Sequence, residues 1–145
     1  MLLKVNDLKN NVTISLTSIQ WQDGEKTETE LMTKARLSHS GSYDIITYDD
    51  TEATGFEGSV TTIKTDGNTA YITREGTANS ALALEVGRKN FCQYDTPYGS
   101  MRLGVYTHNV DNTIAENGRL YLKYSLDLNA SPLSENELIM TIKNN

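Results

Sequence analysis

The segment RLYLKYSLDL, residues 119–128, is a regular alternation of apolar and polar side chains. Successive side chains of a β-strand point to opposite faces, so a segment of this kind forms a strand with one buried and one polar face. Lys123 and Asp127 belong to the polar face. The apolar face consists of Leu120, Leu122, Tyr124, Leu126 and Leu128. The pattern predicts a sheet that covers a core on one side.

The same two-residue period recurs along the chain, in segments rich in the residue types that favour strands. We predict strands at residues 11–19, 26–38, 43–50, 57–65, 69–76, 81–86, 90–96, 101–110, 119–128 and 137–143. No segment has a convincing helical stripe. The best helix candidate is residues 77–85, but Leu82, Leu84 and Val86 alternate there, so we predict a strand.

The turns between these segments favour a closed barrel. Residues 1–145 contain no linker and fit a single domain. Dipeptides such as Asp66-Gly67 and Asn117-Gly118 are typical of tight hairpins, which pair strands that are consecutive in the chain. A long meander has unpaired edges unless it closes. We therefore predict an all-β fold, a single antiparallel up-and-down β-barrel of about eight to ten strands that is wide enough for one small ligand.

Composition excludes several classes of protein. The net charge of −6 and the pI of about 4.8 disfavour nucleic acid as a partner. The apolar runs are too short to span a membrane, so we expect no membrane association. A lone cysteine, Cys92, excludes a scaffold held by internal disulfides. The first residues have no apolar run typical of a secretory signal, so we expect a cytoplasmic protein.

Short motifs in the chain follow one another in a characteristic order. They are TTIK (61–64), ITREG (72–76), YDTPYG (94–99), GRL (118–120) with Tyr124 after it, and NEL (136–138). In this order they resemble the YwiB-like family of bacterial proteins, a domain of unknown function found mainly in Firmicutes. The resemblance covers nearly the whole chain, from Val12 to Lys143. It implies a calycin-like or lipocalin-like β-barrel, and it assigns no activity, substrate or catalytic residue.

Arg74 is the charged residue of greatest interest because it shares a strand parity with Ile72. If Ile72 faces the core, Arg74 faces it too, and a buried guanidinium needs a carboxylate or ligand oxygens beside it. The nearby acids are Asp49, Asp50 and Glu52, in a run that is typical of a solvated loop. Three interpretations stay open: an ion pair with Asp50 or Glu52, an anchor for an anionic ligand, or a register that places Arg74 outside.

Lys64 is the second candidate cation. It alternates with Val60 and Thr62 one strand before Arg74. If the two cations share a mouth of the barrel across the Asp66-Gly67 turn, they attract an anion there despite the negative net charge of the chain. The alternative is an exposed lysine near the end of a strand.

Three tyrosines complete the candidate ligand site. Tyr94 and Tyr124 share an inward parity with their apolar neighbours, and a buried phenol usually finds a hydrogen-bond partner. Tyr98 follows Pro97 at a turn, where it either helps to set the turn or folds over the barrel end. The full set of candidate ligand-binding residues is Arg74, Tyr94, Tyr124, Lys64, Tyr98, Asp50 and Glu52.

Catalytic and metal-binding patterns are absent from the sequence. His39 and His108 are the only histidines and do not have the spacing of metal ligands. Cys92 has no accompanying Cys–His pattern and is typical of a small core residue. There is no glycine-rich phosphate loop, nucleophile elbow or dinucleotide fingerprint. We therefore expect no metal, no cofactor and no catalysis.

Two functions remain. The first is a binding protein for a small, anionic or amphiphilic ligand inside the barrel, with the cluster around Arg74 as its polar contact. The second is a structural or protein-interaction module whose barrel is packed shut and whose outer surface binds a partner or a second copy as a homodimer. The tyrosines predicted on the outer face support the second function: Tyr43, Tyr71, Tyr106 and Tyr121.

Overall fold

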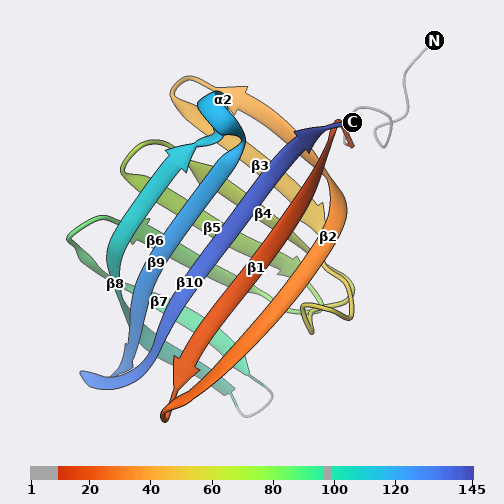
Figure 1. Ribbon diagram of the computed structural model, residues 1–145. Coiled ribbons are helices and arrows are strands. Elements are labelled where there is room, and N and C mark those ends of the chain that lie inside the picture. Colours follow the sequence, from red (N-terminus) through yellow and green to blue (C-terminus); the bar gives the residue numbers. More distant parts are fainter. Residues whose placement is uncertain (1–9, 97–98) are drawn as a thin grey trace.

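The computed structural model describes residues 10–96 and 99–145, with only the backbone of residues 94–96. Ten antiparallel strands form one closed barrel, in which each strand pairs with its neighbours in sequence and β1 closes against β10 (Figure 1). The strands are β1 (Val12–Gln22), β2 (Glu25–Ser40), β3 (Tyr43–Asp49), β4 (Ser59–Thr65), β5 (Thr69–Gly76), β6 (Ser80–Glu85), β7 (Lys89–Thr96), β8 (Gly99–Thr113), β9 (Arg119–Leu128) and β10 (Ser131–Asn144). The prediction of an all-β, up-and-down barrel is confirmed.

One end of the barrel is closed by a single helical turn, α2 (Ile114–Asn117), which the sequence analysis did not predict. Asn117 and Gly118 do not form the tight hairpin we expected. Gly118 instead ends α2 in a left-handed conformation, with φ at 68°, and its N–H donates to the carbonyl of Ile114. One helical turn is too short to show a helical period, and the buried Ile114 side chain holds it against the core. No helix among the described residues is long and apolar enough to cross a membrane.

The opposite end carries the β1–β2 and β9–β10 turns (Figure 1). Both are two-residue turns with positive φ at both positions: 53° and 77° at Asp23 and Gly24, and 52° and 68° at Asn129 and Ala130. Turns of this kind match the twist of the strands that they join. This end has no helix over it among the described residues, and it is called the open end below.

Most strand limits agree with the predicted ones, and β5 and β9 agree residue for residue. The largest difference is β10, which begins at Ser131 rather than at residue 137. A bulge between Pro132 and Ser134 lets β10 follow β9 past the proline. The helix candidate at residues 77–85 contains β6, as predicted, with Leu84 fully buried.

Two neighbouring strand pairs are joined over only part of their length. β2 pairs with β3 only from Arg36 to Ser40, so residues 25–35 pair with β1 alone. β6 and β7 share one pair in register, Ser80 with Tyr94. The barrel wall is therefore incompletely paired on both sides of the β3–β6 segment: between β2 and β3 in the half towards the open end, and between β6 and β7 beyond Ser80, towards the other end.

Candidate functional site

Arg74 lies on β5 with its side chain inside the barrel, 18% exposed. Its Nε donates to Oδ2 of Asp50 and to Oγ1 of Thr61, each at 3.2 Å. Arg74 therefore points inward, as its shared strand parity with Ile72 predicts. The partner among the three candidate acids is Asp50, which precedes β4 and is brought beside β5 because β4 lies between β3 and β5.

Asp50 corrects our expectation that the whole acidic run is solvated. Its side chain has no exposed surface, whereas Asp49 and Glu52 are exposed. Both carboxylate oxygens of Asp50 are hydrogen-bonded: Oδ2 accepts from Thr61 at 2.6 Å, and Oδ1 accepts from Thr54 at 3.1 Å. The alternation of β3 continues for one residue past its end. Asp50 therefore points inward, like the buried Tyr48 two residues before it.

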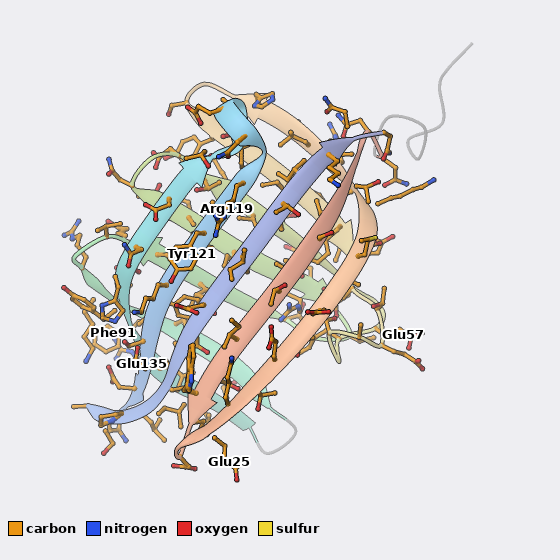
Figure 2. The ribbon with its side chains drawn as sticks, in the orientation of Figure 1. Glu25, Glu57, Phe91, Arg119, Tyr121 and Glu135 are labelled. Carbon is orange, nitrogen blue, oxygen red and sulfur yellow. The ribbon has the colours of Figure 1, made fainter. Side chains whose placement is uncertain are left out.

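Phe56 holds the other side of the arginine. It lies on the loop between β3 and β4, and the guanidinium carbon of Arg74 lies 3.8 Å from the centre of its ring. This is the geometry of a cation–π contact. Figure 2 shows this loop, marked by Glu57, at the side of the barrel. Arg74 is thus fixed at its Nε by Asp50 and Thr61 and over one flat face by Phe56.

A cavity of about 320 Å³ occupies the barrel beside Arg74. Its polar wall consists of Ser18, Gln20, Thr27, Thr29, Tyr48, Thr54, Arg74, Ser80, Tyr124 and Asn136. Its apolar wall consists of Leu16, Ile19, Phe56, Ile72, Ala81, Leu82, Cys92, Leu103, Leu126 and Leu138. The wall includes Thr27 and Thr29, from the part of β2 that lacks β3 as a neighbour, and Thr54 and Phe56 from the loop between β3 and β4.

Two titratable groups in the cavity wall are held in their neutral forms. Burial raises the pKa of Tyr48 from 10.0 to about 12, and the negative charge of Asp50 adds to this effect. Burial also raises the pKa of the Cys92 thiol. Glu137 borders the cavity, but its carboxylate accepts from the Tyr121 hydroxyl at 2.6 Å. The described residues that line the cavity thus include one cation, Arg74, and one acid, Glu137, while Asp50 pairs with Arg74 without lining the cavity itself.

Lys64 does not share the cavity mouth with Arg74, which corrects our interpretation of β4. Lys64 is exposed on the outer face, where its Nζ lies 4.5 Å from the centre of the Tyr43 ring. The inward residues of β4 are Ser59, Thr61, Ile63 and Thr65. Both faces of this strand carry threonines and one aliphatic residue, so the sequence does not distinguish them. A shift of one residue exchanges the faces completely.

The predicted tyrosines fall into three groups. Tyr124 is half-buried on β9 and lines the cavity. Tyr98 lies outside the described residues, as does the side chain of Tyr94. The four tyrosines predicted on the outer face are largely covered by their neighbours, and Tyr106 is the most exposed of them at 41%. Among the described aromatic residues, Phe91 of β7 is the most exposed, at 58% (Figure 2).

Among the residues that the structure describes, neither histidine lines the cavity. His39 and His108 are exposed, and they contact Asp44 and Ser125 respectively, at 2.6 Å. Within the described residues no three His, Cys, Asp or Glu side chains are placed to hold a metal ion. Two other depressions, of about 580 and 460 Å³, lie on the outer faces of β8–β9 and β7–β8 and are more open than the cavity.

Sequence reasoning missed several residues of the site, among them Tyr48, Phe56 and Thr61. Tyr48 had a usable signal, because it shares the parity of the buried Ile46 on β3. The sequence has no such signal for Thr61, since either face of β4 could be the inward one. Phe56 lies in a loop between Gly55 and Gly58, and no periodic pattern indicates where a loop side chain points.

Comparisons with known proteins agree with this fold and name no function. A family model described as Domain of unknown function (DUF1934) matches residues 14–140. The chain is similar to a solved structure described as ywiB protein from Bacillus subtilis, with a TM-score of 0.79 and 15% sequence identity over 95% of this chain and 94% of that chain. At this identity the likeness shows the fold alone. No curated protein matches the sequence.

Proposed function

The chain belongs to the family described as a domain of unknown function, DUF1934, and from the geometry of its barrel we propose that it is a non-catalytic binding protein for a small ligand held inside the barrel. One observation carries this proposal. A cavity of about 320 Å³ opens to the surface and combines an apolar wall with a few polar groups around Arg74. Pockets for small molecules have this composition and a volume of about 300 Å³ or more.

The state of the titratable groups supports a role without catalysis. A general base needs a free acceptor, but both oxygens of Asp50 accept hydrogen bonds from side chains. A cysteine nucleophile needs a lowered pKa, but burial raises the pKa of Cys92. The phenol of Tyr48 stays protonated at neutral pH for the same reason.

The test is titration of the full chain with 1-naphthylamine, an uncharged probe close to the size that the cavity holds, whose emission shifts to shorter wavelength in apolar surroundings. We expect one probe to bind per chain. A tryptophan at an inward position of the cavity wall, Ser18→Trp, is expected to abolish this binding by filling the space. The matched control is Thr17→Trp, the adjacent outward position on β1, which should bind the probe like the original protein.

Circular dichroism of both variants shows whether each is folded. A folded Ser18→Trp variant that binds the probe as well as Thr17→Trp does would contradict binding inside the barrel. An original protein that binds no probe would contradict it too.

A further inference from the structure

We propose that the ligand of this cavity is a monocarboxylate with an apolar tail, whose carboxylate binds the two terminal nitrogens of Arg74. This inference rests on the proposed function, because it names the chemical class that the cavity selects. It follows from four features: the fixed orientation of the guanidinium, its free donors, the charges around it and the shape of the apolar wall.

The guanidinium is held in one orientation before any ligand arrives. Its Nε lies 3.2 Å from both Asp50 Oδ2 and Thr61 Oγ1, and Phe56 covers one flat face with its ring centre 3.8 Å away. Asp50 is itself held by Thr54 and Thr61. A side chain fixed in this way loses little conformational entropy when it binds a ligand, which increases affinity.

The part of Arg74 left for a ligand is the pair of Nη groups. A purely structural arginine–carboxylate pair is commonly bidentate, with two parallel hydrogen bonds. Here Asp50 contacts Nε. Across the described parts of the chain, no hydrogen bond to either Nη of Arg74 is found, although 82% of the side-chain surface is covered, since 18% is exposed. Neither Nη group is fully buried, since Thr107 Oγ1 is the one fully buried side-chain atom without a partner among the described residues. An acceptor from outside the chain can therefore reach both Nη groups.

The charges around Arg74 favour a single negative charge on the ligand. Asp50 already balances Arg74. Lys64, the other cation considered for this site, lies on the outer face of β4. A dianionic phosphate would therefore bring two charges to one compensated cation, next to the buried Asp50. A planar carboxylate brings one charge and matches the two parallel N–H directions of the guanidinium.

The apolar wall sets the size of the tail. Leu82, Leu103 and Leu126 come from three different strands and line the cavity. At roughly 30 Å³ for each non-hydrogen atom, a volume of about 320 Å³ holds about ten such atoms. Octanoate has that size and is the probe we choose.

The experiment measures how well three eight-carbon compounds displace 1-naphthylamine from the full chain: sodium octanoate, octyl phosphate and 1-octanol. We expect octanoate to bind at least tenfold more tightly than either of the others. In Arg74→Gln, the advantage of octanoate over 1-octanol should fall below threefold, while 1-octanol binds as before. Lys64→Gln is the matched control, a cation removed from the outer face of the neighbouring strand, and it should leave all three affinities unchanged.

Arg74→Gln leaves Asp50 without its partner, so the double variant Asp50→Asn/Arg74→Gln provides the same test with both charges removed. It should also lose the preference for octanoate and keep 1-octanol binding. If octyl phosphate or 1-octanol binds as tightly as octanoate to the original protein, the carboxylate inference is wrong while binding in the barrel stands. If the neutral probe does not bind at all, the proposed function fails as well.

Discussion

The two halves of the barrel interior differ in how they are filled. Towards α2, a group of inward apolar side chains without exposed surface packs together: Ile46, Ile63, Leu84, Leu120 and Met140. Towards the open end, the inward positions carry Ser18, Gln20, Ser80 and Asn136, and a cavity lies between them. The same strands build both halves, since β1 contributes Val12 and Ile14 to one and Ser18 and Gln20 to the other.

This difference separates stability from binding within one sheet. A ten-stranded barrel has a width set by strand number and tilt, so the volume of the inward side chains decides whether it is filled or hollow. Buried apolar side chains form the packed core of the α2 half. Serine, threonine and amide side chains in the other half leave space and keep polar groups exposed to it. The packed half therefore stabilises the fold, and the hollow half is available for a ligand.

We expect the largest difference between the halves in the free energy of unfolding, when one leucine in each half is replaced by alanine. Both leucines lie on β9. Leu120→Ala in the packed half should lower the free energy of unfolding by about 3 kcal/mol, because it creates a cavity in a filled core. Leu126→Ala, which borders an existing cavity, should cost about half as much. Urea unfolding of both variants measures the two values. Equal losses would mean that the hollow half is as well packed as the other.

The Arg74–Asp50 pair tests whether the hollow half contains its own stabilising centre. Asp50→Asn keeps the shape of the side chain and leaves Arg74 without a counter-charge, so we expect a loss of about 2 kcal/mol. The value is below that of a fully buried pair because Arg74 is 18% exposed. Asp49→Asn, at the exposed neighbouring position, should change unfolding by less than about 0.5 kcal/mol. A matching loss in both variants would show that the buried ion pair contributes nothing of its own.

Alkaline pH should reveal Tyr48, at the border of the two halves. Its pKa is about 12 in the folded state and 10.0 as the ordinary value, so the fold favours the protonated phenol. That contribution is complete below pH 10 and is lost as the pH rises through about 12, a fall of roughly 2 kcal/mol in the free energy of unfolding. Unfolding curves between pH 9 and about 12 measure it. Tyr48→Phe should remove this part of the fall, and an unchanged pH profile in that variant would refute the assignment.

The smallest expected effect concerns a glycine at each end of the barrel. Gly118 and Gly24 both have positive φ, 68° and 77°. A Cβ on Gly118 would lie 2.5 Å from the carbonyl oxygen of Ile142, whereas one on Gly24 would meet nothing within 4 Å. We therefore expect Gly118→Ala to cost about 1 kcal/mol more than Gly24→Ala, since both have the same backbone strain and one adds a clash. Thermal unfolding of the two variants would show whether the α2 end is indeed the tighter one.

Much of the packed half follows from local pattern. Alternating residues predict each strand and, in β1, β5 and β9, also the inward face, because one parity there is clearly apolar. The pattern also predicts that Arg74 points inward, because Arg74 shares the parity of the apolar Ile72. It is insufficient for β4, where both parities look alike, and it misses α2, which is one turn long.

The hollow half depends on contacts between residues that are far apart in the chain. Asp50 and Arg74 are separated by 24 positions, and Phe56 reaches Arg74 from a loop. Alternation along a strand establishes which residues form strands and that the strands cover a core, since it reflects the geometry of each strand alone. Which acid meets the arginine, which side Lys64 takes and where the interior stays empty are decided only when the barrel closes, because closure sets the register and the distance across it.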